Sequence, residues 1–377
     1  MIWPGKGNTS TEKAVVTLVE FSCGTKIVSG AGAVGKLGDF RAERVFLVTD
    51  PYFEKNGTAQ RIGDLTKAAH VEIFSGVRPD PSVELAAEGT AKLLAFLPDL
   101  IVALGGGSAM DCAKAIRWFA KTEAKLVAIP TTSGSGSEVT DFAILTHASR
   151  KHPLVDGKLR PYMAILDSDL LTELPPSLIA DTGFDVLAHA LEAVAATGAG
   201  AVSDALAKEA FRIVFNLLPK SFRGEGSVRL AVHEGATMAG MAFTQAGLGL
   251  CHAMAHSLGG VFHIPHGRLN AILLPGVLAI NAPAAGKKYG ELARAAGMEG
   301  SADTVALRNL RNGLVRLRRE LNLPETLAQA GISPREVRAA SAEIVRGTLA
   351  DPCCGTNPVK VEEMTVRQLL EEVTGRG

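Results

Sequence analysis

Short apolar runs alternate with amphipathic segments in the first half of the chain. Residues 82–96 and 109–121 place apolar side chains at helical spacing. Residues 15–21 and 25–32 predict a strand pair at a sheet edge. Strands that alternate with helices of this length predict an α/β fold with a mostly parallel sheet covered on both faces. The three apolar runs that predict its central strands are residues 44–50, 99–108 and 125–137.

The pattern changes after Pro175 and Pro176. Beyond this point β-branched runs thin out, and Ala, Leu, Met and charged residues recur at helical period. Ser203–Leu218 and the stretch after Ala306 are amphipathic in this way. A chain of 377 residues is long enough for two hydrophobic cores. We therefore predict an α/β domain in residues 1–176 and an all-helical domain in residues 177–377.

Composition narrows the classes of function. The 39 basic and 39 acidic residues cancel, so no excess charge is available to bind a nucleic acid backbone. Apolar runs such as residues 271–280 are shorter than the roughly 20 residues of a membrane span, and the first residues lack the pattern of an export signal. The five cysteines are odd in number and lack zinc-type spacing, which favours reduced thiols in the cytoplasm.

Two loops at predicted strand ends are rich in glycine and hydroxyl groups. Residues 105–108 read Gly-Gly-Gly-Ser between a strand and a helix, and residues 131–138 read TTSGSGSE after the next strand. Glycines let a backbone approach a pyrophosphate, and a helix N-terminus favours its charge. Asp50 ends an earlier strand, where it suits a ribose. This acid precedes the glycines by 55 residues, unlike the usual dinucleotide fingerprint, so tight turns remain the alternative for these loops.

The second half carries a concentrated set of metal-ligand residue types. Asp185 and His189 are four residues apart, hence on one face of a helix. Four of the nine histidines fall within one fifteen-residue segment. A single histidine on an apolar helix is usually structural, but this grouping indicates a metal such as Fe²⁺ or Zn²⁺. Spacing alone does not choose among the four histidines, which are His252, His256, His263 and His266.

The surroundings of these histidines add two expectations. The string HAMAH, residues 252–256, lacks the glutamate of a metalloprotease helix, which disfavours hydrolysis by that route. Pro265 is expected to end the helix and to place His266 on a separate turn.

Long motifs in this order resemble the iron-containing (group III) alcohol dehydrogenase family over nearly the whole chain, and most of all its microcompartment-type 1-propanol dehydrogenases. The resemblance implies an NAD-linked enzyme that interconverts a small alcohol and its aldehyde, and an N-terminal nucleotide-binding domain. It also implies a homodimer or larger homo-oligomer in the cytoplasm or inside a microcompartment. The matching motifs are VTDPYF, RPDPS, GGGSAMDCAKAI, IPTTSGSGSEVT, LPPSLIADTGFDVLAHALEA, GMAFTQAGLGLCHAMAHSLGGVFHIPHG and DPCCGTNP.

The resemblance also assigns roles to individual residues. It implies that His256 carries the proton and that His263 has no ligand role. Asp80 departs from the asparagine of many members, which puts that nucleotide contact in doubt. The implied metal ligands are Asp185, His189, His252 and His266. The implied NAD-binding residues are Asp50, which favours NAD over NADP, Gly105, Gly106, Gly107, Ser108, Asp111, Thr131, Thr132, Ser137 and Lys151.

Phe142, Phe243 and Cys353 match family positions on the substrate side. Apolar side chains there favour short unbranched aldehydes over polyols, although both phenylalanines would also suit a plain core. Three alternatives stay open: a zinc-dependent polyol dehydrogenase of related architecture, a lyase of the dehydroquinate synthase type, and a non-enzymatic binding module.

Overall fold

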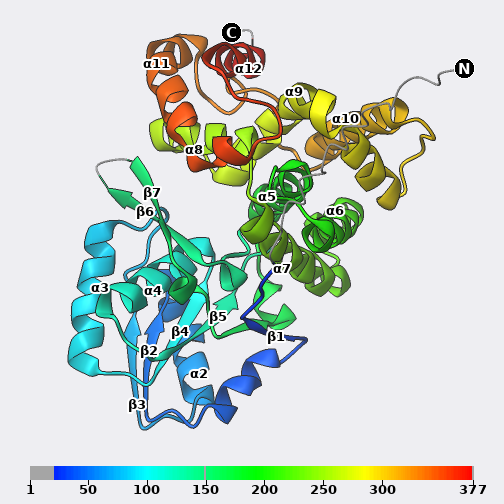
Figure 1. Cartoon of the computed structure of the whole chain (residues 1–377). Coiled ribbons are helices and arrows are strands. Elements are labelled where there is room, and N and C mark those ends of the chain that lie inside the picture. The colour runs from blue at the N-terminus through cyan, green and yellow to red at the C-terminus, as the bar shows by residue number, and fades with distance from the viewer. Residues whose placement is uncertain (1–20, 148–149, 376–377) are drawn as a thin grey trace, which may run out of the picture.

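The computed structural model describes residues 21–147 and 150–375. Its first part is built on a six-stranded sheet in which every strand pair is parallel (Figure 1). Parallel strands need a crossover between neighbours, which the intervening helices supply. In order across the sheet, the strands are β1 (Lys26–Ser29), β8 (Met163–Leu166), β5 (Lys125–Pro130), β4 (Leu100–Gly105), β2 (Arg44–Val48) and β3 (His70–Phe74).

Helices cover both faces of this sheet. Phe46 and Val48 of β2 pack with α3 (Val83–Phe96) and α4 (Gly107–Ala120) on one face. Val45 and Leu47 alternate with them and belong to the other face. The second face is covered by η1 (Ala33–Asp39) and α2 (Thr58–Leu65), and α1 (Pro51–Lys55) follows β2 directly.

An antiparallel hairpin separates β5 from β8. Its strands are β6 (Phe142–His147) and β7 (Arg150–Val155), with Phe142 opposite Val155. The sequence pattern does not predict this hairpin. Short helical turns flank it, namely η2 (Ser137–Val139) and η3 (Gly157–Leu159), and a further turn, η4 (Ser168–Leu171), follows β8.

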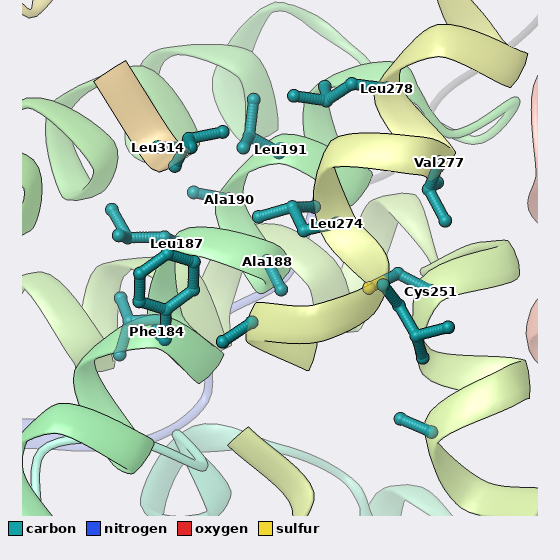
Figure 2. Close-up of a cluster of buried hydrophobic side chains, with 14 of the residues drawn as sticks. Phe184, Leu187, Ala188, Ala190, Leu191, Cys251, Leu274, Val277, Leu278 and Leu314 are labelled. Carbon is teal, nitrogen blue, oxygen red and sulfur yellow. The ribbon is translucent and has the colours of Figure 1, made fainter. Parts of the chain in front are cut away.

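From Pro176 onward the described residues form helices and connecting loops, as the sequence pattern predicts. Helix α5 (Pro176–Ala195) lies at the centre and is buried over nearly its whole circumference. Figure 2 shows Phe184, Leu187 and Leu191 of this helix in a cluster with leucines of α9 and α10. The remaining elements are α6 (Ala201–Phe222), η5 (Gly226–Val228), α7 (Arg229–Ala246), α8 (Leu250–Phe262), α9 (His266–Ala295), α10 (Asp303–Glu320), α11 (Pro334–Ala350), η6 (Pro352–Thr356) and α12 (Glu363–Thr374).

Helix α9 is long and apolar enough to pass for a membrane span by length and composition. The most apolar stretch of α9 is 67% buried inside the protein, so core packing accounts for its composition.

One local expectation needs revision, and another falls largely outside the described residues. Helix α8 ends at Phe262, before Pro265, with His263 in the left-handed region at φ 55°. Pro265 is then the residue before α9, and His266 begins that long helix instead of lying on an isolated turn. At the sheet edge, β1 pairs with β8, and its expected partner at residues 15–21 lies almost wholly outside the described residues. The domain boundary at residue 176 stays a prediction.

Candidate metal and cofactor site

Three helices bring imidazoles to one carboxylate oxygen. Asp185 and His189 lie one turn apart on α5, and Asp185 Oδ1 is 3.8 Å from His189 Nε2. His252 of α8 and His266 of α9 each place Nε2 at 3.6 Å from the same oxygen. The ligand atoms of Asp185, His252 and His266 lie within 4.8 Å of one another. His189 completes the cluster by stacking on His252 with ring centroids 4.5 Å apart.

A glycine permits the close contact between α5 and α9. A Cβ atom built on Gly267 would lie 1.8 Å from the backbone oxygen of Asp181 and 3.2 Å from Asp185 Cβ. A side chain at this position would therefore push the start of α9 away from α5. Because His266 precedes Gly267 directly, the glycine sets the approach of His266 to Asp185.

Glu192 of α5 orients His252 from outside its helix. Helix α8 starts after Gly249, which has no side chain to cap it. Glu192 instead accepts hydrogen bonds from the backbone N–H of Cys251 and from Nδ1 of His252, both at 2.6 Å. Donation from Nδ1 turns Nε2 toward Asp185, which is the orientation a metal-binding histidine needs.

Burial and neighbouring charges set the protonation of the cluster. Burial lowers the pKa of His189 to about 3 and that of His266 well below its usual value, so both rings are neutral at pH 7. Burial also opposes the charge on His252, but hydrogen bonds to Asp185 and Glu192 outweigh it and raise this pKa to about 9. For Asp185, burial raises the pKa, and the surrounding imidazoles overcome that effect and hold it well below its usual range.

The donor set fits a divalent transition metal. It consists of an ionised carboxylate and three imidazoles whose Nε2 atoms face it, enclosed by apolar helices. Asn270 of α9 also touches the cluster, since its Nδ2 donates to Asp185 Oδ1 at 2.7 Å. Without a cation, this buried carboxylate would be balanced only by protons and amide dipoles.

His256 lies beside the cluster and has a carboxylate partner of its own. Its ring stacks on His266 with centroids 5.1 Å apart, and its Nδ1 lies 2.8 Å from Asp351 Oδ2. Asp351 also accepts the backbone N–H of Cys353 at 2.9 Å, which fixes the carboxylate at the start of η6. Burial opposes ionisation of Asp351, but the hydrogen bond with His256 prevails and lowers its pKa.

An open cleft of about 810 Å³ lies at the carboxyl ends of the strands. Its wall includes Thr182, three residues before Asp185 on α5, so the cleft leads toward the imidazole cluster. Arg61 and Arg78 also line it and offer charge for phosphate groups. Of the expected NAD-binding residues, those in the lining are Asp50, Gly106, Gly107, Ser108, Thr131 and Thr132.

Gly105 lies just behind this wall. Its φ of 147° and the 2.7 Å distance from a built Cβ to Ala109 Cβ both require glycine at the turn from β4 to α4. Asp50 caps α1 by accepting the backbone N–H groups of Tyr52 and Phe53. Lys151 of β7 forms a 2.8 Å ion pair with Asp80, so the unusual acid at position 80 has a basic partner.

Asp111 and Ser137 form an internal network instead of lining the cleft. Ser137 donates to Asp111 at 2.7 Å. The buried ammonium of Lys114 donates to Ser137 at 2.9 Å, and to Thr140 and the Phe142 carbonyl at 2.8 Å. Burial lowers the pKa of Lys114 to about 8, against the opposing effect of Asp111. The network holds the hydroxyl-rich loop against α4.

The three expected substrate-side residues lie near the imidazoles. Phe243 is buried and stacks on His189 with centroids 4.4 Å apart. Phe142 contacts Phe243 at a centroid distance of 5.9 Å. Cys353 lies within 4.8 Å of His256 and Asp351, measured between possible ligand atoms.

Sequence reasoning missed four polar residues that support these groups. Glu192 and Lys114 could have been found, because each interrupts an apolar helix near a residue already singled out. Asn270 follows His266 by one helical turn and offers a similar signal. Asp351 begins the DPCCGTNP motif, but nothing in its local sequence relates it to His256.

The chain is similar to known proteins over most of its length. Residues 24–168 match the family model described as iron-containing alcohol dehydrogenase, and residues 179–374 match that of the C-terminal part of the Fe-containing alcohol dehydrogenase family. The chain is 38% identical to the 1-propanol dehydrogenase PduQ of Citrobacter freundii, over 94% of this chain and 99% of the relative. It is 33% identical to the NADPH-dependent butanol dehydrogenase of Clostridium saccharobutylicum, with 94% and 97% covered.

Solved structures agree with the family match. The sulfoacetaldehyde reductase of Bifidobacterium kashiwanohense in complex with NAD⁺ superposes with a TM-score of 0.87. The sequence identity of the pair is 26%, and the match covers 96% of this chain and all of the other.

Proposed function

Because the chain belongs to the iron-containing alcohol dehydrogenase family, we propose that it transfers a hydride between NAD(H) and a short-chain primary alcohol or aldehyde, such as 1-propanol or propanal. Alcohol–aldehyde oxidoreduction itself follows from membership of the family. The polyol dehydrogenase alternative is not favoured, because both matching family models are those of iron-containing alcohol dehydrogenases and a relative that covers nearly the whole chain is a 1-propanol dehydrogenase. Membership of a family of enzymes also argues against the alternative of a non-enzymatic binding module.

Asp185, His189, His252 and His266 would hold Fe²⁺. The observation that carries this proposal is the approach of three Nε2 atoms to Asp185 Oδ1, at 3.6 Å for His252 and His266 and at 3.8 Å for His189. When bound, the ion would supply Lewis-acid stabilisation to the substrate oxygen. Glu192 and Asn270 keep His252 and Asp185 in place for that purpose.

The dinucleotide would bind in the cleft beside Asp50, the Gly-Gly-Gly-Ser turn and Thr131–Thr132. The free N–H groups at the start of α4 suit the pyrophosphate. The carboxylate of Asp50 would accept hydrogen bonds from ribose hydroxyls and repel the extra phosphate of NADP. Asp111, Ser137 and Lys151 support this role indirectly, since Asp111 and Ser137 hold the loop next to Thr132 and Lys151 neutralises Asp80.

His256 would carry the proton between the substrate oxygen and solvent. Asp351 accepts the hydrogen bond of Nδ1, which leaves Nε2 free for transfer. The ring is partly exposed, with 21% of the side chain accessible, so protons have a route to water.

Phe142, Phe243 and Cys353 would form the substrate side. The aromatic side chains offer no hydrogen-bond partner to the additional hydroxyl groups of a polyol. A short unbranched substrate is therefore favoured over a polyol. As the family resemblance of its motifs implies, we further propose a homodimer or larger homo-oligomer that works in the cytoplasm or inside a microcompartment.

Anaerobic reconstitution tests the proposed function. The metal-free protein is loaded with Fe²⁺ or Zn²⁺ and assayed with NADH and NADPH on propanal, lactaldehyde and, in the reverse direction, glycerol. The proposal expects the iron form with NADH and propanal to be the most active combination. Higher activity of the zinc form on glycerol would overturn it.

A further inference from the structure

A second group of metal-binding side chain types lies beside the proposed iron ligands. His256, Asp351 and Cys353 each offer one ligand atom, and the three atoms lie within 4.8 Å of one another. We propose that these residues form a second cation site, selective for thiophilic ions such as Zn²⁺ and Cd²⁺, and that its occupation inhibits the enzyme. The inhibition rests on the proposed function of His256, whereas binding of the ion does not.

Two independent elements hold the three side chains in position. His256 projects from α8, and its Nδ1 is 2.8 Å from Asp351 Oδ2. Asp351 and Cys353 lie on one turn at the start of η6, where the other carboxylate oxygen accepts the Cys353 N–H. Because these contacts order the carboxylate, the ring and the turn in advance, a cation would find its ligands largely preorganised.

The ligand distances suit a small tetrahedral ion after modest movement. Atoms bound at about 2.0–2.3 Å to tetrahedral zinc lie roughly 3.3–3.7 Å from one another. The present separations range from 2.8 Å to at most 4.8 Å, so shifts on the order of 1 Å would suffice. Three protein ligands and a water molecule would complete the coordination.

Ligand chemistry distinguishes this site from the first one. Asp185 and its three imidazoles offer oxygen and nitrogen, whereas the second group adds a sulfur atom. Thiolate favours Zn²⁺ and Cd²⁺ over hard ions such as Mg²⁺. Burial raises the pKa of the Cys353 thiol well above its usual value, so the ion would displace the thiol proton to solvent when the sulfur binds.

Occupation of this site would disable the proposed proton carrier. The His256 ring stacks on His266, one of the proposed iron ligands, so the second ion would lie next to the catalytic centre. A cation bound to one nitrogen of the His256 ring occupies the lone pair of the neutral imidazole and leaves the proton on the other nitrogen, so the ring can no longer accept and release protons in turn. Loss of a general acid–base residue usually lowers turnover by about 10²–10⁴-fold.

The neighbouring cysteine provides a matched control. Cys354 is chemically identical and adjacent in sequence, but its Sγ contacts the Thr348 carbonyl oxygen at 3.1 Å and is not part of the three-residue group. The exposed Cys23 is replaced by serine in every variant, because a free surface thiol would bind the probe by itself.

Cadmium serves as the probe, because thiolate binding gives an ultraviolet charge-transfer absorption. The iron-loaded full-length enzyme is titrated anaerobically with Cd²⁺, and absorption, iron content, bound cadmium and turnover are recorded. We expect one added cadmium ion, the charge-transfer band and loss of turnover by about 10²-fold, with iron retained. Cys354→Ser should behave in the same way, and Cys353→Ser should lose both the ion and the band while it keeps its iron.

Absence of the band in the parent protein, or its persistence in Cys353→Ser, would overturn the second site. Loss of the band in Cys354→Ser would overturn the ligand assignment. A bound ion and a normal band with unchanged turnover would leave the site in place and contradict the inhibition, and with it the proton-carrying role of His256. Displacement of iron by cadmium without a charge-transfer band would show binding at the first site and contradict the proposal.

Discussion

The proposed iron ligands and the proposed dinucleotide cleft are held in place by different means. Around Asp185, side chains on three helices position one another: Glu192 orients His252, and Asn270 contacts the carboxylate. The cleft is instead lined largely by glycine backbone and small hydroxyl groups at strand ends. A buried group with specific partners is costly to disturb, whereas an open, backbone-lined surface tolerates the loss of one side chain. Substitutions should therefore have larger effects in the first region.

The largest effect is expected for Asp185→Asn. Removal of the ionised carboxylate should abolish iron retention and lower turnover by at least about 10³-fold, because a metal ion supplies several kcal/mol of transition-state stabilisation. Metal content and steady-state kinetics measure this. The control is Asp181→Asn on the same helix, which breaks the ion pair with Arg268 but should keep the metal. Stoichiometric iron in Asp185→Asn would contradict the ligand assignment.

The next largest effect is expected for His256→Ala. In this variant kcat should fall by about 10²–10⁴-fold and the iron should be retained. Asp351→Asn should give a smaller loss of kcat, because the ring remains but its orientation is no longer fixed by a carboxylate. In both variants KM for the aldehyde should change less than kcat. A change confined to KM, or loss of iron from His256→Ala, would argue against a role in proton transfer.

Glu192→Gln should weaken iron binding by about 10–100-fold, since it removes the charge that orients His252. Competition with a chelator measures the change in affinity. Glu209→Gln, which alters an exposed glutamate paired with Arg212, is the control and should leave the affinity unchanged. Equal affinities in the two variants would mean that Glu192 serves only the fold.

Gly267→Ala tests how closely α9 must approach α5. The added methyl group collides with the Asp181 backbone, and we expect a loss of about 1–3 kcal/mol in the free energy of unfolding. Gly286→Ala in the same helix meets no atom within 4 Å and should gain about 0.5–1 kcal/mol. Denaturant unfolding of both variants measures these changes in the free energy of unfolding. No loss of stability in Gly267→Ala would show that the two helices can separate freely.

The smallest effect is expected in the cleft. Asp50→Ala should improve the use of NADPH relative to NADH by about tenfold, as one unfavourable charge interaction is removed. The ratio of kcat/KM values for the two coenzymes measures this preference. Asp169→Ala, at another acid of the same cleft, should leave the ratio unchanged. An unaltered ratio in Asp50→Ala would remove Asp50 from coenzyme selection.

Some features of the fold and of the site could be predicted from the sequence, and others could not. Continuous apolar runs located the starts of β2, β4 and β5 to within one residue, because buried parallel strands require such runs. Polar residues inside apolar helices likewise pointed to Asp185 and His189. The strands β6 and β7 lacked a clear alternating pattern and were missed.

Partners that are distant in sequence were harder to predict. Glu192 lies 60 residues from His252, and Asp351 lies 95 residues from His256. Short motifs carry no information on such pairs. The motifs also did not reveal that Asp111 and Ser137 hydrogen-bond to each other, because the orientation of a side chain depends on the packing around it.

Anomalous diffraction at the iron absorption edge, on crystals of the iron-loaded enzyme, tests the central claim most directly. We predict a single strong peak in contact with Asp185 and with the Nε2 atoms of His189, His252 and His266. A peak bound to other side chains, or a peak that one or more of these four residues does not reach, would contradict it.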